Sequence, residues 1–245
     1  MTKEVFPGTC RDDRRGERLA DEFGAWHKRR YNAFTLIELV LVVGIITVLA
    51  GLVLSTVGYA RKKGARARAE TEIAAISAAC ENYKADNGVY PRDPIVNTAT
   101  DKLNAKTDGN PMLNPLPPNP SGATYPLASL VLYRALSGDR NLDRSITTAD
   151  QSFNIDGTTL TPPLTQLPQS YFTFKPNMLS PAGGTGTVTG IVDPFGNSYG
   201  YSTAYQYDPN TGYNPTFDAW STCGETAPKT GETFQQYQLR WIKNW

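Results

Sequence analysis

The chain has 245 residues, of which 40% are hydrophobic and 19% are charged, and its formal net charge is +1 at pH 7. The near balance of 24 Lys and Arg against 23 Asp and Glu excludes a general attraction to nucleic acid. The one histidine, His27, precedes the long apolar run, so no Ser–His or Cys–His pair exists beyond it. With no P-loop or GxSxG motif either, we expect a protein that is not an enzyme.

Residues 1–33 are charged and have no apolar periodicity, which is typical of a disordered tail. They also lack the apolar core of an ordinary secretory signal. From Leu39 to Ala60 no residue is charged, and this run is long enough to cross a bilayer as a helix. Its glycines recur every seven residues (Gly44, Gly51 and Gly58). Glycines at this spacing let another helix approach, although they also suit an ordinary membrane helix.

A basic run from Arg61 follows the apolar segment, and because both flanks of that segment are basic, charge does not decide its orientation. Apolar residues then recur at steps of three and four, the period of an amphipathic helix: Ile73, Ile76, Cys80 and Tyr83. Asn87-Gly88 is a plausible helix stop. We therefore expect one helix from Phe34 to Asp86, embedded in a membrane at its start and packed on a sheet at its end.

The remainder of the chain is expected to be loop-rich, with short strands. The proline-dense stretch 110–126 cannot form a regular helix or a central strand. Residues 127–138 predict a short helix that Gly138 closes. The aromatic stretch 169–179 predicts a strand, and so do the segments 186–208, 215–225 and 237–245, in which aromatic or β-branched residues alternate with turn residues.

The junction before the apolar run resembles the class III signal of type IV pilins and type II secretion pseudopilins. It reads Lys28-Arg29-Arg30, then Ala33, then Phe34-Thr35-Leu36-Ile37-Glu38. The resemblance implies that a prepilin peptidase cuts between Ala33 and Phe34 and that the new amine of Phe34 is N-methylated. Ala33 replaces the usual glycine, the leader is long for this class, and Ser55 replaces a helix-kinking proline, so we expect a straighter helix.

Three further stretches resemble the major pseudopilin of type II secretion. They are "YKADNGVYP" (83–91), "DPFGNSYGY" (193–201), and "FDAWSTCGE" (217–225) followed by "IKNW" (242–245). Type IVa pilins share only the N-terminal half, so these C-terminal motifs favour secretion. The implied fold is α+β and type IV pilin-like, a long helix packed on a small antiparallel sheet. Its expected segments are a leader (1–33), a transmembrane and assembly helix (34–60), an amphipathic half-helix (61–91), an unmatched insertion (92–192) and a β region (193–245).

The resemblance implies a structural subunit with one pass through the bacterial inner membrane and a periplasmic globular domain. Copies would assemble with other pseudopilins, on an inner-membrane platform, into a helical periplasmic fibre that drives protein export. One alternative is a type IV pilin for adhesion, motility or DNA uptake. Another is a membrane-anchored binding protein whose residues 92–192 recognise a sugar or another ligand.

Glu38 is the one acid of the apolar run. An ionised carboxylate at the centre of a membrane helix costs about 2.5–3.5 kcal/mol, and less near its end. The resemblance supplies a partner that would offset this cost, namely the Phe34 ammonium of a neighbouring subunit in the fibre. The Phe34 amine of the same chain is an alternative, and so is simple stabilisation by the helix dipole.

Calcium is the one cofactor that the sequence suggests. The resemblance implies a site at Asp218 and Glu225, seven residues apart. Independently, Asp139 to Asp150 has the ligand spacing of an EF-hand-type loop, with Arg144 at the sixth place, where glycine is usual. Its candidate ligands are Asp139, Asn141, Asp143, Ser145 and Asp150. A solvated turn and a polar loop are the plain alternatives.

Two cysteines, Cys80 and Cys223, remain if the leader is removed. They could pair in an oxidising compartment, although their spacing along the chain says nothing about their distance.

Overall fold

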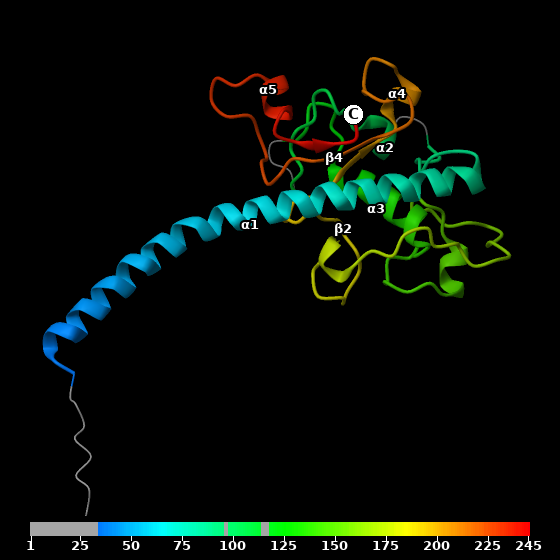
Figure 1. Ribbon diagram of the computed structural model, residues 1–245. Coiled ribbons are helices and arrows are strands. Elements are labelled where there is room, and N and C mark those ends of the chain that lie inside the picture. The colour runs from blue at the N-terminus through cyan, green and yellow to red at the C-terminus, as the bar shows by residue number, and fades with distance from the viewer. Residues whose placement is uncertain (1–33, 96–97, 114–117) are drawn as a thin grey trace, which may run out of the picture. The chain divides into compact units, whose positions relative to one another are not determined.

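The computed structural model describes residues 34–95, 98–113 and 118–245, except for the side chain of Ser55. The chain divides into two compact units, Met1–Leu54 and Ser55–Trp245. Helix α1 (Leu36–Asn87) contributes to both units without a break, which confirms the predicted single long helix (Figure 1). It ends where the sequence predicted, because Gly88 has a φ of +76° and donates its N–H to the Lys84 carbonyl at 2.8 Å.

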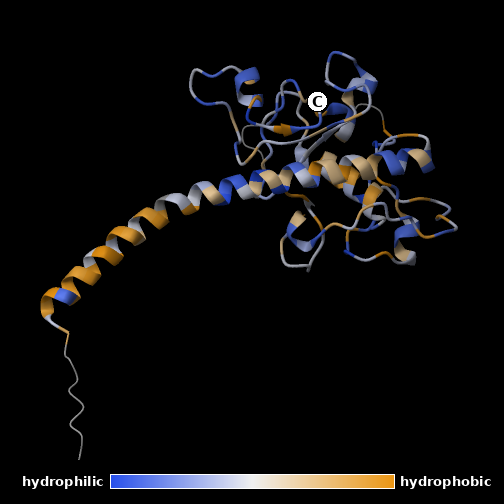
Figure 2. Ribbon diagram, in the orientation of Figure 1, coloured by the Kyte–Doolittle hydropathy of each residue, from blue (hydrophilic) through white to orange (hydrophobic). Residues whose placement is uncertain are grey.

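The first half of α1 is apolar on every side (Figure 2). Its large side chains are exposed throughout, from Leu36 at 81% to Leu54 at 74%. Among the described residues, α1 is the one helix that is long and apolar enough to cross a membrane. A helix that is hydrophobic all round needs an apolar environment, and the described residues provide none for this half.

The predicted short helix is also present, as α3 (Tyr125–Ser137). The Thr124 hydroxyl caps its start by accepting the Leu127 N–H at 3.5 Å. Gly138 ends it in the left-handed conformation, with a φ of +83°, and donates to the Arg134 carbonyl. The side chains of α3 that face the core belong to the insertion 92–192, so this unmatched region helps to build the fold.

In the part of the chain that the structure describes, five short strands form two antiparallel sheets. In the first, β1 (Leu179–Ser180) pairs with β2 (Gly190–Ile191). In the second, β4 (Asp218–Ser221) lies between β3 (Gly200–Ser202) and β5 (Ile242–Lys243). Together with the long helix, these sheets confirm the expected α+β layout.

Three strand predictions were wrong in part, and in the segment 186–208 residues 204–207 form a helix instead of a strand. Residues 169–178 contain no strand. Their regular structure is the 3₁₀ turn η2 (Pro176–Met178), and only Leu179 pairs in β1. The start of the 237–245 segment belongs to helix α5 (Phe234–Gln238), because Thr233 and Gln236 form a capping box ahead of β5. The other short elements are α2 (Ala99–Lys102), η1 (Thr148–Ser152) and α4 (Ala204–Tyr207).

The predicted apolar stripe on the second half of α1 is buried. Its residues are Ile73, Ile76, Cys80 and Tyr83, each at most 8% exposed. They share one core cluster with Leu132 and Leu136 of α3 and with residues of both sheets. A hydrogen bond fixes the docking, because the Tyr199 hydroxyl donates to Glu72 Oε2 at 2.7 Å. The helix therefore covers the sheets and α3 together rather than a sheet alone.

Candidate functional site

The start of α1 is a capping box made by Thr35 and Glu38. The Thr35 N–H and hydroxyl donate to Glu38 Oε2 at 2.9 and 2.8 Å, and the Glu38 N–H donates to the Thr35 hydroxyl at 3.3 Å. Thr35 is thus the N-cap and Glu38 the third residue of the helix, the spacing that satisfies two otherwise unpaired N–H groups. The helix dipole also stabilises a carboxylate in the first turn. The capping box gives Glu38 a partner within its own chain before any assembly.

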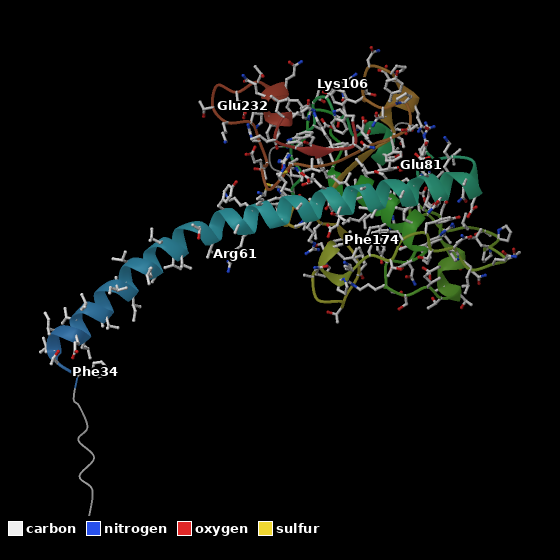
Figure 3. All side chains as sticks on the ribbon, in the orientation of Figure 1. Phe34, Arg61, Glu81, Lys106, Phe174 and Glu232 are labelled. Atoms are coloured by element: carbon white, nitrogen blue, oxygen red, sulfur yellow. The ribbon has the colours of Figure 1, made fainter. Side chains whose placement is uncertain are left out.

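Phe34 lies at the outer end of this box, and its side chain is exposed (Figure 3). In the uncut chain its nitrogen is a peptide amide, so Phe34 carries no ammonium group for Glu38 to meet. The predicted cut is on the other side of this amide. Ala33 and the basic leader residues lie outside the described residues.

The space beside the three glycines that were predicted to let another helix approach contains no atom of the described residues. No atom of the described chain lies within 4 Å of the place where a Cβ would stand on Gly44, Gly51 or Gly58. No described residue therefore uses the close approach that these glycines allow. Their role in contacts between subunits stays a prediction.

The motif "DPFGN" forms a closed turn between β2 and β3. Asp193 Oδ1 accepts the N–H groups of Phe195 at 2.9 Å and Asn197 at 3.0 Å. Its Oδ2 accepts the hydroxyl of Ser221, at the end of β4, at 2.5 Å. Asp193 is almost fully buried, and burial raises the pKa of its carboxyl. This motif is structural, because it joins the turn to the central strand of the second sheet.

The terminal "IKNW" segment is held to the same sheet by Asn244. Its Oδ1 accepts the Ala219 N–H at 2.9 Å, and its amide donates to the Phe217 carbonyl at 3.2 Å. The Trp245 ring stacks on Tyr213 with centroids 4.8 Å apart. The C-terminal motifs that resemble the pseudopilin therefore form one connected structure around β4.

The first calcium prediction falls on two carboxylates that already have partners. Asp218 is buried, and its two oxygens accept the N–H groups of Tyr213 at 2.8 Å and Asn214 at 2.9 Å. Glu225 accepts a guanidinium N–H of Arg240 at 2.6 Å. Calcium needs several converging oxygen ligands. As arranged, these two residues do not fit a shared ion, and Asp218 instead closes the loop that precedes β4.

The second calcium prediction falls on a loop closed by its own hydrogen bonds. At its first place, buried Asp139 accepts the Asp143 N–H at 3.1 Å, the Arg144 N–H at 2.7 Å and the Tyr133 hydroxyl at 2.8 Å. Arg144, at the sixth place, has a φ of +75°. The backbone therefore makes the sharp turn that glycine usually supplies in EF-hand loops, although an arginine stands there.

The other end of this loop is also held by hydrogen bonds within the loop. Asp150 is fully buried and its Oδ1 accepts the N–H groups of Arg140 at 2.7 Å and Asn141 at 2.9 Å. Its Oδ2 accepts the Thr147 N–H at 2.7 Å. Ser145 donates its own N–H to Asp143 at 2.9 Å. The loop has a positive φ at its sixth place, while its carboxylates are engaged by N–H donors.

Across the described parts of the chain, no three His, Cys, Asp or Glu residues come together as a metal site would require. Calcium therefore stays a prediction. Cys80 and Cys223 are both free thiols, the first buried and the second partly exposed. The Cys223 sulfur lies 3.6 Å from the Arg66 guanidinium.

A pocket of about 320 Å³ lies wholly within the unmatched insertion. Its walls include Tyr133 and Phe174, whose ring centroids are 5.2 Å apart, together with Phe172. The Arg144 guanidinium borders it and is held by the carbonyls of Gly186 and Pro181 at 2.8 and 2.6 Å. The insertion thus provides a largely apolar hollow whose lining also contains the Arg144 guanidinium and the Asp139 carboxylate.

Sequence reasoning missed two features of the site. The signal for the capping box was present in Thr35-x-x-Glu38, the usual mark of a helix start. No comparable signal marks Arg66, which donates to the Arg240 carbonyl at 2.9 Å and so ties α1 to the C-terminal segment. The two residues are 174 positions apart, and only the folded chain brings them together.

Comparison with known families agrees with this geometry. Residues 28–54 match the prokaryotic N-terminal methylation motif, which covers the basic leader end, the capping box and most of the apolar half-helix. The class is therefore that of chains with a prepilin-type N-terminus. No solved structure matches this chain significantly.

Comparison with curated relatives narrows the class. The chain is 34% identical over 109 residues to type II secretion system core protein G of Aeromonas hydrophila, covering 42% of this chain and 76% of that one. It is 35% identical over 107 residues to the protein of the same name from Pseudomonas aeruginosa, covering 40% and 73%. The chain belongs to the family of type II secretion system core protein G.

Proposed function

We propose that this chain is a structural, non-enzymatic pseudopilin of a type II secretion system. One observation carries the proposal: α1 is an unbroken helix whose capped, apolar first half is exposed in the part of the chain that the structure describes. Such a half-helix suits a membrane first and a bundle of identical helices afterwards. The connected C-terminal motifs around β4 support secretion over the surface-pilus alternative.

The proposed sequence of events begins in the inner membrane. The chain enters it once through α1, with the globular unit in the periplasm. Prepilin peptidase then removes residues 1–33 by cutting between Ala33 and Phe34, and the Phe34 amine is methylated. Subunits leave the bilayer by packing their apolar half-helices together with other pseudopilins. The growing periplasmic fibre pushes folded proteins out of the cell.

An export assay tests this function. Deleting the gene should leave the secreted enzymes of the organism in the periplasm, and a plasmid copy should restore their export. Loss of export in the deletion strain, together with no surface filament in electron micrographs of the wild type, supports the pseudopilin. Normal export in the deletion strain, together with the loss of a surface pilus, would instead establish a type IV pilin.

The pocket in the insertion supports a second candidate, a membrane-anchored binding protein. Its aromatic walls at Phe172 and Phe174 and the Arg144 charge suit a small ligand with an apolar body and an acceptor oxygen. Screening sugars and other small ligands against the full chain, with Phe174→Ala as the matched variant, tests this candidate. Binding that Phe174→Ala removes, in a strain with normal export, would favour it.

Calcium binding remains part of the proposal, and its better candidate is the loop that begins at Asp139. The positive φ at Arg144 gives this loop the turn that an EF-hand-type site needs, whereas Asp218 and Glu225 have separate partners and Glu225 is paired with Arg240. Isothermal titration with calcium should give heat for the wild-type chain and none for Asp139→Ala, with Asp218→Ala unchanged. No heat from the wild type would remove calcium from both loops.

A further inference from the structure

Three consecutive cations follow the apolar segment directly. The side chains of Arg61, Lys62 and Lys63 are exposed, and none makes an ion pair or hydrogen bond with another described residue. We call these three residues the basic collar. Figure 3 shows Arg61 projecting from α1, with no other element beside it.

The next cations along the helix are different. Arg66 pairs with Glu70 at 3.3 Å and also donates to the Arg240 carbonyl. Arg68 pairs with Glu72 at 2.6 Å. Each of these arginines has an acid four residues on, so its charge is balanced within the globular unit. The collar has no such acid, and no other described residue balances its charge.

The collar also surrounds the helix instead of marking one face. Successive residues of an α-helix turn by about 100°, so three in a row point to three sides. The first fully buried residue of α1 is Ala69, two turns further on. A protein partner would use one side of the helix, whereas lipid surrounds a single membrane helix on all sides.

The residues before the collar fit a membrane boundary. No residue between Leu39 and Ala60 is charged, and Tyr59 is 74% exposed, two residues before Arg61. Tyrosine is enriched where a bilayer meets water, because its ring is apolar and its hydroxyl is polar. Tyr59 and the collar together place the headgroup layer at this turn of α1.

We propose that the basic collar binds anionic phospholipid headgroups on the side of the membrane that carries the globular unit. This inference rests on the proposed function only in requiring that α1 crosses the membrane. A basic residue at an anionic surface strengthens binding about fivefold. The collar would hold each subunit at a fixed depth until it leaves the bilayer.

Spin-labelled lipids test the collar on the full chain reconstituted in vesicles of phosphatidylcholine with a minority of phosphatidylglycerol. The wild type should immobilise labelled phosphatidylglycerol more than labelled phosphatidylcholine. In the triple variant Arg61→Gln, Lys62→Gln, Lys63→Gln this preference should fall by about fivefold or more, and salt should weaken it in the wild type. Inorganic phosphate should compete no better than another salt of equal ionic strength.

A matched control neutralises three exposed lysines of the globular unit with Lys102→Gln, Lys175→Gln and Lys229→Gln, and it should keep the preference. Equal immobilisation of the two lipids by the wild type, or an unchanged preference in the collar variant, would overturn the proposal. If such a result came with a loss of fibre in the collar variant, the collar would bind acidic groups of neighbouring subunits instead. A wild type that fails to insert into vesicles would refute the membrane step itself, which separates the two failures.

Discussion

Replacing Glu38 by alanine should leave the chain inserted and cleaved but should remove nearly all assembled fibre. In the proposed mature chain the amine of Phe34 is positive, and within the proposed bundle of apolar helices it would need a negative partner. Leaving one charge of a buried pair without its partner costs about 3–5 kcal/mol. The measurement is the amount of sheared or cross-linked fibre, compared with membrane-inserted and cleaved subunit in the same cells.

The capping box makes a sharper version of this experiment possible. Glutamine at the third helical position can still serve in a capping box, so Glu38→Gln removes the charge and keeps the cap. Thr35→Ala does the reverse, because it removes the capping hydroxyl, at a cost of about 0.5–2 kcal/mol, and keeps the charge. We expect the Glu38→Gln chain to fail in assembly as the Glu38→Ala chain does. The Thr35→Ala chain should assemble. A Glu38→Gln chain that forms normal fibre would reduce Glu38 to a helix cap.

The largest effect on stability is expected from Trp220→Ala. Trp220 is fully buried in the central strand β4, and its indole N–H donates to the Tyr125 hydroxyl at 2.8 Å. Its ring stacks on Trp241 with centroids 6.0 Å apart and meets Trp245 edge to face at 5.7 Å. Truncating a buried tryptophan to alanine costs about 3–5 kcal/mol. Denaturant unfolding of the full chain in detergent, followed by the fluorescence of the remaining tryptophans, measures this loss.

Two comparisons support the interpretation of that experiment. Leu239→Ala changes a side chain that is 77% exposed, so its effect should stay within about 0.5 kcal/mol. Gly200→Ala should be destabilising like the Trp220 change, because a Cβ on Gly200 would stand 2.2 Å from the Trp220 ring. A Trp220→Ala chain as stable as the Leu239→Ala chain would mean that this cluster does not hold the second sheet.

The long helix and its buried stripe could be predicted because their signals are local. An uncharged run, steps of three and four residues from Ile73 to Tyr83 and the stop at Asn87-Gly88 each depend on neighbours along the chain. The C-terminal motifs were also recognisable, although their role was not. Asp193 and Asn244 turned out to hold β4 in place, through contacts that cross 28 and 25 residues.

The remaining misses come from elements that tertiary contacts decide. Residues 171–174 have strand-like aromatics, yet the N–H groups of Tyr171 and Phe172 both donate to the Leu136 carbonyl at the end of α3. Residues 237 and 238 alternate like a strand, but the capping box at Thr233 makes them helical. For calcium, the spacing along the sequence identified the carboxylates of the 139–150 loop as candidate ligands. It could not show that backbone N–H groups already bind these carboxylates.

The mass of the mature N-terminal peptide tests most directly whether this chain is processed as a pseudopilin. We expect a protein that begins at Phe34, with one methyl group on its amine and without residues 1–33. A membrane-bound chain that keeps Ala33 and the residues before it, in cells with an active prepilin peptidase, would contradict this processing.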